Sequence, residues 1–378
     1  MPSSTSSFKR KLRLPRLFFA EPGEITPRDY ERPIPPVPWR GMTVVAVLIV
    51  IAATAAWELY VRSLGYGPTL NDTEDLWTQV RRRVGPESLV IVGESRPLFD
   101  LDLDELEKGL GKRPIQLALP GSCAYPVLAD VINDDKFHGT IICSIVPGMF
   151  FAPGGPLLET SEKALKRYRN QTVAQRVSHH LGMFLEERVA FLKQEDLTLD
   201  MLLNKVPLRN RPNALVPPTF PPYFQTVDRE RRARMIEKCA QPGELQTRIQ
   251  QIWLPLFTPP PPPSFVPKEV FMEQMGKAVE ARFRDTVAAV NKLRARGGKI
   301  VFVRFPNNGE LKVLENRLSP RDKTWDPLIK STGAPGIYYE DYPELSTFVC
   351  PEWSHLSAGD SVEFSKRLVP HLRTALGM

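Results

Sequence analysis

The chain has 378 residues and a formal net charge of +7, with 42% hydrophobic and 25% charged residues. That balance is typical of a packed core and excludes a wholly disordered chain, and the length allows one large domain or two ordinary ones. No basic stripe interleaved with aromatic residues occurs after the N-terminal region, so nucleic acid is not an expected partner.

The N-terminal region predicts a membrane anchor. Residues 1–40 contain eight Lys or Arg against four acidic residues and are rich in proline. From Met42 to Trp57 no charge occurs, and continuing through Val61 approaches the ~20 residues that span a bilayer. We therefore expect a basic cytoplasmic tail (1–40) and a transmembrane helix (41–62). Because no Lys or Arg lies between Ser63 and Val80, the positive-inside rule places the body outside the cytoplasm.

Two other interpretations of this segment exist. Ala53-Thr54-Ala55 resembles a signal-peptide cleavage site, but the forty-residue leader is long for a signal peptide. A buried core helix fits poorly, because the run is apolar on all faces. The anchor is the favoured interpretation.

The body reads as an α/β domain. After a linker with a short helix (63–84), apolar runs predict buried strands that alternate with helices. Such alternation indicates a parallel sheet flanked by helices, here over residues 85–378. The expected strands are Ser88–Val92, Ile115–Leu119, Thr140–Val146, Lys299–Phe305 and, more weakly, Gly336–Tyr339; the expected helices between them are Asp102–Leu110, Tyr125–Asn133 and Glu269–Arg296.

Residues 150–268 interrupt this alternation and are expected to form a helical, proline-rich insertion. Helices are predicted over 157–167, 174–192 and 229–254. Pro259–Pro263 is either a stiff spacer or a polyproline segment that recruits a partner. Because the insertion leaves between the third and fourth strands, it is a candidate cap over the sheet.

Two short segments carry the residues suited to catalysis. Ser95 directly follows the first strand, where ligands bind in parallel sheets, although serine there also serves as a helix cap. His355 lies two residues before Ser357, which with Asp360 resembles a capping box at the start of the last helix. Glu352, three residues before His355, can orient the imidazole, which is the arrangement of a serine triad.

The order of these segments resembles the SGNH, or GDSL-like, hydrolase superfamily. The matching residues are Gly-Glu-Ser-Arg around Ser95, Leu-Pro-Gly-Ser at Leu119–Ser122 and Glu-x-x-His at Glu352–His355. The resemblance covers residues 85–378 apart from the insertion and implies a flavodoxin-like fold. It also implies Ser95 as nucleophile, His355 as base and Glu352 as the orienting acid. The amides of Ser95 and Gly121 are then the oxyanion donors.

The chain departs from the family pattern in three places. Glu94 and Glu352 stand where the family usually has Asp. The third block normally supplies an oxyanion asparagine, but residues 146–149 read Val-Pro-Gly-Met. Loss of one such donor lowers the rate by about 10²–10³. Asn307 or Asn308, after the fourth strand, is a candidate replacement.

Other polar residues allow alternatives. Arg96 is a candidate contact for an anionic substrate, or else pairs with Asp100 or Asp102. Cys123 and Cys350 flank the second and last blocks and form a candidate disulfide. Without CxxC spacing or paired histidines, we expect no metal site, and no cofactor is expected either.

Two functions are carried forward. The first is a membrane-anchored serine esterase or O-acyltransferase that acts on acyl esters of cell-envelope or secreted polysaccharide. Membrane-anchored relatives of this type imply a bacterial inner-membrane protein with a periplasmic body and a multi-pass membrane acyltransferase as partner. The second is an inactive SGNH-like scaffold or glycan-binding subunit of a membrane polysaccharide assembly.

Overall fold

The computed structural model describes residues 37–193, 197, 199–204, 220–259 and 265–378. Most of the predicted basic tail and most of Pro259–Pro263 lie outside these ranges. The chain divides into two compact units, Met1–Ala56 and Trp57–Met378.

One apolar helix dominates the described part of the first unit and extends into the second. Helix α1 (Trp39–Ser63) has 25 residues, a mean hydropathy of 2.2 in its most apolar window and side chains that are almost all exposed. Among the described helices it is the one long and apolar enough to cross a membrane.

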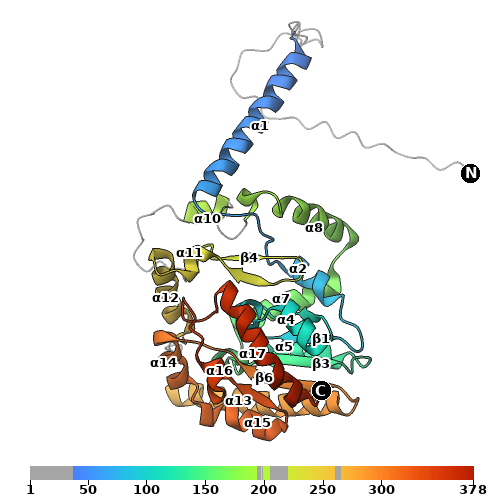
Figure 1. Ribbon diagram of the computed structural model, residues 1–378, viewed down its shortest axis with the longest axis vertical. Coiled ribbons are helices and arrows are strands. Elements are labelled where there is room, and N and C mark those ends of the chain that lie inside the picture. The colour runs from blue at the N-terminus through green and yellow to red at the C-terminus, as the bar shows by residue number, and fades with distance from the viewer. Residues whose placement is uncertain (1–36, 194–196, 198, 205–219, 260–264) are drawn as a thin grey trace, which may run out of the picture. The chain divides into compact units, whose positions relative to one another are not determined.

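The second unit is built on a five-stranded parallel sheet (Figure 1). Its strands lie in the order β2-β1-β3-β6-β7, and pairs such as Ile91 with Ile142 and Ile142 with Val301 set the register. The strands are almost wholly buried, which explains their continuous apolar runs. They are β1 (Leu89–Val92), β2 (Pro114–Gln116), β3 (Thr140–Ser144), β6 (Lys299–Arg304) and β7 (Gly336–Tyr338).

Helices flank the sheet in two groups. One group packs α17 against α3 and α4, and the other packs α13 against α5 and α15. All five expected strands and the helices between them are confirmed, with ends shifted by a few residues. The helices are α2 (Glu74–Arg81), α3 (Arg96–Asp100), α4 (Leu103–Leu110), α5 (Tyr125–Asn133), α6 (Pro147–Phe150), α13 (Lys268–Arg294), α14 (Gly309–Leu318), α15 (Trp325–Thr332), α16 (Pro343–Ser346) and α17 (Ala358–Leu376), with short turns η3 (Arg321–Lys323) and η4 (Tyr339–Asp341).

The insertion between β3 and β6 contains both helices and a hairpin. Its elements are α7 (Pro156–Asn170), α8 (Val173–Glu186), η2 (Ala190–Leu192), α10 (Leu199–Asn204), β4 (Gln225–Val227), β5 (Ala233–Met235), α11 (Glu237–Ala240) and α12 (Glu244–Phe257). The helix predicted over 229–254 is therefore wrong in its first part, where β4 and β5 pair antiparallel.

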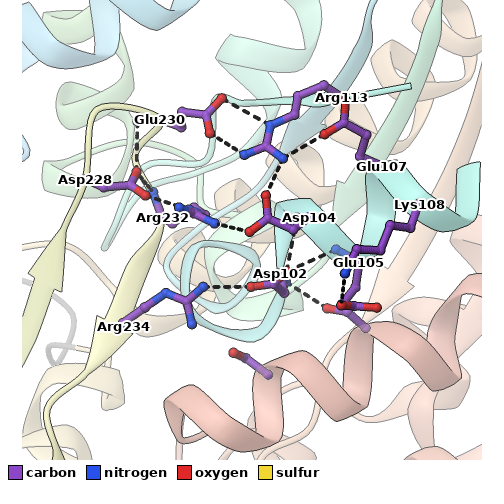
Figure 2. Close-up of polar contacts among 12 residues, drawn as sticks. Asp102, Asp104, Glu105, Glu107, Lys108, Arg113, Asp228, Glu230, Arg232 and Arg234 are labelled. Carbon is purple, nitrogen blue, oxygen red and sulfur yellow. Dashed lines mark hydrogen bonds and ion pairs between the residues drawn. The ribbon is translucent and has the colours of Figure 1, made fainter. Parts of the chain in front are cut away.

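Local and tertiary contacts explain why this segment turns instead of continuing as a helix. The Asp228 carboxylate accepts hydrogen bonds from the amides of Glu230 and Arg232, and Arg231 takes a left-handed φ of 63°. Around the turn, arginines meet acidic residues of the α4 region: Arg232 binds Asp104 at 2.7 Å, and Arg234 binds Asp102 at 2.8 Å (Figure 2). A helix would carry these arginines away from their partners.

Arg231 fixes the hairpin to the end of β2. Its side chain is fully buried, forms a bidentate ion pair with Asp72 at 2.6 and 2.7 Å, and donates to the carbonyls of Gln116 and Ala118. These carbonyls lie where β2 ends, so the hairpin is held beside the carboxyl edge of the sheet.

Candidate active site

Three side chains distant in sequence form a continuous hydrogen-bonded relay. The Ser95 hydroxyl lies 2.7 Å from Nε2 of His355, and Nδ1 of the same ring lies 2.7 Å from Oε1 of Glu352. His355 and Glu352 are buried, while Ser95 is partly exposed. With Nδ1 protonated, the ring donates to Glu352 and accepts the serine proton at Nε2, which is the geometry of a general base held by a carboxylate.

The end of β1 places Ser95. Gly93 lets Pro97 and Ser144 approach the backbone closely just before Ser95. A Cβ at this position would lie 2.6 Å from both Pro97 Cγ and Ser144 Cβ. Ser95 is the N-cap residue of α3, yet its side chain makes no capping hydrogen bond. Its hydroxyl is directed to His355 instead, so Ser95 takes the cap position of α3 without capping it through its side chain.

A strained loop before α17 places Glu352 and His355 together. Trp353, between them, has a left-handed φ of 79°, a conformation that a bulky residue rarely adopts. Asn308 holds this loop: its amide donates to the Trp353 carbonyl at 2.9 Å, and its side-chain oxygen accepts from the Cys350 amide. After the loop, Ser357 accepts from the Asp360 amide at 3.1 Å, so the predicted cap of the last helix is confirmed.

The insertion contributes residues to the relay that the sequence did not reveal. Trp253 of α12 donates its indole N–H to Oε2 of Glu352, the oxygen that His355 does not use. Gln250, one turn earlier, donates to the Pro351 carbonyl at 2.8 Å. No motif marks either residue; the only signal is a tryptophan on a predicted helix of the insertion.

Aromatic rings enclose the imidazole. Phe99 of α3 stacks on His355 with ring centroids 4.2 Å apart, and Trp253 meets its edge at 5.8 Å. Phe224, just before β4, stacks on Phe99 at 5.4 Å. These rings keep water from most of the base and fix the orientation of its ring.

The expected oxyanion donors lie on neighbouring strand ends. Beyond β2 the chain continues along β1, with the Leu117 amide donating to Ile91 and the Leu119 amide to Gly93. Gly121 and Ser95 each follow two residues later, so both reach the same edge of the sheet. Gly121 has a left-handed φ of 59°, which favours glycine there.

The proposed replacement for the missing oxyanion asparagine is not supported. Asn307 is buried and donates its side-chain N–H to Glu315 at 3.0 Å, while its oxygen accepts from Tyr339 at 3.1 Å. Asn308 holds the loop of Glu352 and His355, as described above. Among the described contacts, none joins either asparagine to Ser95. Asn307 contacts Glu315 and Tyr339, and Asn308 contacts the loop that carries Glu352 and His355.

Arg96 is structural in this arrangement. Its guanidinium is fully buried and binds Glu315 of α14 through two nitrogens, and Arg304 binds the same carboxylate. The expected pairing with Asp100 or Asp102 is therefore wrong, and the buried position leaves no route to a substrate. Burial alone would raise the pKa of Glu315, but the two guanidinium groups hold that pKa below its usual value.

Two buried carboxyl groups beside the relay behave in the opposite way. Burial raises the pKa of Glu94, whose Oε1 accepts from Ser144 at 2.7 Å. Burial also raises the pKa of Asp100 well above its usual value, and its Oδ1 accepts from the Leu356 amide at 2.8 Å. In both groups burial disfavours the charged form.

The remaining expectations concern cysteines and metals. All four cysteines are free and buried, so the candidate disulfide between Cys123 and Cys350 is wrong: their thiols face the carbonyls of Phe150 and Pro306, respectively. Within the described ranges, no group of three or more His, Cys, Asp or Glu is placed to hold a metal ion. A surface hollow lined by residues 85–88, Lys112 and Arg113 precedes β1 and β2, and so lies at the opposite edge of the sheet from Ser95.

Three comparisons with known proteins found no relative of this chain. No protein-family model matches the chain, and neither the curated proteins nor the solved structures contain a match to it.

Proposed function

We propose that this chain is a membrane-anchored serine acyl-transfer enzyme whose catalytic body lies outside the cytoplasm. The observation that carries the proposal is the relay from Ser95 through His355 to Glu352, with both contacts at 2.7 Å. A serine hydroxyl has little nucleophilicity at neutral pH, and this arrangement is the usual means of activating it.

In the first half-reaction, Ser95 Oγ attacks the carbonyl carbon of an acyl ester while Nε2 of His355 takes its proton. The resulting imidazolium is stabilised by Glu352, whose second oxygen is held by Trp253. The tetrahedral intermediate collapses as His355 returns the proton to the leaving alcohol oxygen. The products are the free alcohol and an acyl ester on Ser95.

The negative oxygen of the intermediate is stabilised by backbone amides. Ser95 and Gly121 supply these donors at the carboxyl ends of β1 and β2, where helix α3 also begins. Because Asn307 donates to Glu315 and Asn308 holds the loop of Glu352 and His355, we propose no third, side-chain donor for this site. We therefore expect a slower enzyme than one with three donors, by about 10²–10³.

In the second half-reaction, His355 removes a proton from the acceptor, which attacks the acyl-serine and releases Ser95. If the acceptor is water, the enzyme is an esterase; if it is a sugar hydroxyl, the enzyme is an O-acyltransferase. An esterase needs only its substrate, whereas a transferase outside the cytoplasm needs an acyl donor delivered through the membrane, and hence a multi-pass membrane partner.

The family and location belong to the same proposal. When the strands of the large sheet are numbered by themselves, their order is 2-1-3-4-5, which is the flavodoxin-like order. The chain direction across this sheet reverses between β1 and β3, and Ser95 follows β1. This supports membership of the SGNH-like superfamily. Helix α1 and the preceding basic residues support a single-pass protein of a bacterial inner membrane with a periplasmic body. Cell-envelope or secreted polysaccharide is then the accessible substrate.

A second candidate is an inactive SGNH-like scaffold or glycan-binding subunit. The absent third-block asparagine and the glutamates at positions 94 and 352 favour it. The relay argues against it, because an inactive site has no need to hold serine, histidine and carboxylate within hydrogen-bonding distance.

Turnover of acyl esters tests the proposal. We expect the reconstituted full-length protein to hydrolyse a chromogenic acetyl ester, and Ser95→Ala and His355→Ala each to lose this activity. Ser122→Ala is the matched control, because Ser122 is a buried serine of the second block whose hydroxyl bonds only the Leu119 carbonyl. Unchanged turnover in both Ser95→Ala and His355→Ala would overturn the proposal in favour of the scaffold.

A further inference from the structure

Helix α8 of the insertion presents an apolar face to solvent. Five of its fourteen residues are large, apolar and at least half exposed. They are Val173 (71%), Val177 (54%), Leu181 (65%), Phe184 (53%) and Leu185 (50%).

These residues form one continuous stripe. They recur at intervals of three and four, so they share one face of the helix. The opposite face carries Met183, which is 3% exposed and packs into the smaller hydrophobic cluster, where insertion residues meet Leu70, Leu76, Leu98 and Phe99. The solvent-facing side of a surface helix normally carries polar residues, but on α8 that side is apolar. A contiguous exposed apolar stripe of this kind indicates a binding surface.

The segment that follows α8 contacts the end of α1. The Glu58 carboxylate accepts hydrogen bonds from the amides of Ala190 and Phe191 at 2.9 and 3.1 Å, and both residues lie within five positions of the end of α8. Arg62 donates to the Arg188 carbonyl at 3.0 Å. All these residues belong to the unit Trp57–Met378, so the end of α8 is fixed to the last two turns of the apolar helix.

We propose that α8 lies in the interfacial region of the lipid bilayer, with its apolar stripe among the acyl chains. This inference rests on the membrane anchor of the proposed function. At fourteen residues α8 is too short to span the hydrocarbon core, which needs about 20 residues, but an amphipathic helix of this length lies along the surface.

Several neighbouring features fit a lipid surface as the occupant. Leu59 and Tyr60 near the end of α1, and Leu64 just after it, are also about half exposed or more. Arg176 and Arg188 lie exposed on α8 and just after it, where they can meet lipid phosphates. Helix α10 lies at the same end of the body as α8 (Figure 1), and its Leu199 and Leu203 are likewise exposed.

Site-directed spin labelling of the full-length protein tests this placement. The four native cysteines are buried, so a single introduced cysteine takes the label. The test variant is Leu181→Cys in phosphatidylcholine–phosphatidylglycerol nanodiscs, and the matched control is Val313→Cys on α14, an apolar residue of similar exposure at 69%. Collisions with oxygen, which concentrates in lipid, are compared with collisions with a water-soluble nickel chelate.

We expect the label at position 181 to lose collisions with the nickel chelate and to gain collisions with oxygen, whereas the label at 313 shows the reverse. Equal nickel access at both positions would overturn the inference. Protection of position 181 from both reagents would also overturn it and would indicate a protein partner or a second copy of the chain. Val47→Cys within α1 separates the two proposals: a lipid-exposed label at 47 with an aqueous label at 181 refutes the interfacial helix alone, and an aqueous label at 47 refutes the anchor.

Discussion

Glu352 carries two hydrogen bonds, one from His355 and one from Trp253. The second bond holds the carboxylate in the rotamer that meets His355 Nδ1, so Trp253 is a positioning residue. Hydrogen bonds to charged groups are worth roughly 1.5–3 kcal/mol.

We therefore expect Trp253→Phe, which keeps the aromatic packing but removes the N–H, to lower kcat about tenfold or more with little change in KM. Steady-state kinetics with an acyl ester measures both constants. Phe257→Leu is the control, because Phe257 touches the Trp253 ring without reaching Glu352. A kcat equal to wild type in Trp253→Phe would show that Glu352 needs no second partner.

Asp100 makes the stability of the folded chain depend on pH. Burial raises the pKa of Asp100 well above its usual value in the folded chain. At a pH between the pKa values of the unfolded and folded states, Asp100 is therefore ionised more completely in the unfolded chain. The free energy of unfolding that this group contributes is complete below the unfolded pKa of about 3.9 and falls as the pH rises toward the folded pKa.

Asp100→Asn cannot ionise and keeps the acceptor oxygen for the Leu356 amide. We expect its free energy of unfolding to exceed that of wild type by more at pH ~7 than at pH ~4. Denaturant unfolding at both values measures the difference. Asp104→Asn should behave oppositely, because a hydrogen bond from Arg113 lowers the pKa of Asp104. A pH-independent difference for Asp100→Asn would contradict the account.

At this scale the sequence indicated the three residues of the relay but not the residues that support them. Ser95, Glu352 and His355 were found because each belongs to a short motif beside a strand or helix end. Trp253 and Asp100 could not be found, because their roles arise from contacts between segments about 100 and 250 residues apart. Asn307 was misjudged for the same reason: nothing local shows that Glu315 takes its amide.

The β4–β5 hairpin is the element whose attachment decides whether the insertion stays on the sheet. Arg231 at its turn is fully buried and is paired with Asp72, whose side chain is 6% exposed. Around it, Arg113 and Arg232 link Glu230 and Asp228 with the acidic residues of α4 (Figure 2).

Removing Arg231 leaves the Asp72 charge buried without a partner. We expect Arg231→Ala to lower the free energy of unfolding by about 3–5 kcal/mol. Arg229→Ala is the matched control two positions earlier, and it should change that free energy little, since its pair with Glu187 is exposed. Calorimetric or denaturant unfolding compares the two. Similar losses in both variants would mean that burial of the Arg231 pair is not what holds the hairpin.

The β4–β5 hairpin could not be predicted from the local sequence pattern, whereas the large sheet could. The strands of the large sheet were predictable, because full burial produces unbroken apolar runs such as Leu89–Val92. The segment around Arg229–Arg234 has no such run and is rich in residues with good helix propensity. Its hairpin is selected by the Asp228 turn and by ion pairs with distant residues, which the local pattern does not contain.

For the whole molecule, the proposed anchor would decide which substrates the proposed site meets. If α1 spans a membrane with the basic tail inside, a C-terminal alkaline phosphatase fusion should be active and a C-terminal green fluorescent protein fusion dark, because the first folds only outside the cytoplasm and the second only inside. The same fusions placed after residue 38 should give the reverse. A bright C-terminal fluorescent fusion would contradict the periplasmic body.

The central claim is that Ser95 is an activated nucleophile, and covalent labelling tests it most directly. A fluorophosphonate reacts only with a serine whose proton has a base to accept it. Peptide mapping of the labelled full-length protein should place one adduct on Ser95, and Ser95→Ala and His355→Ala should each lose it while Ser122→Ala retains it. An unlabelled wild-type protein, or labelling that persists in His355→Ala, would contradict the account.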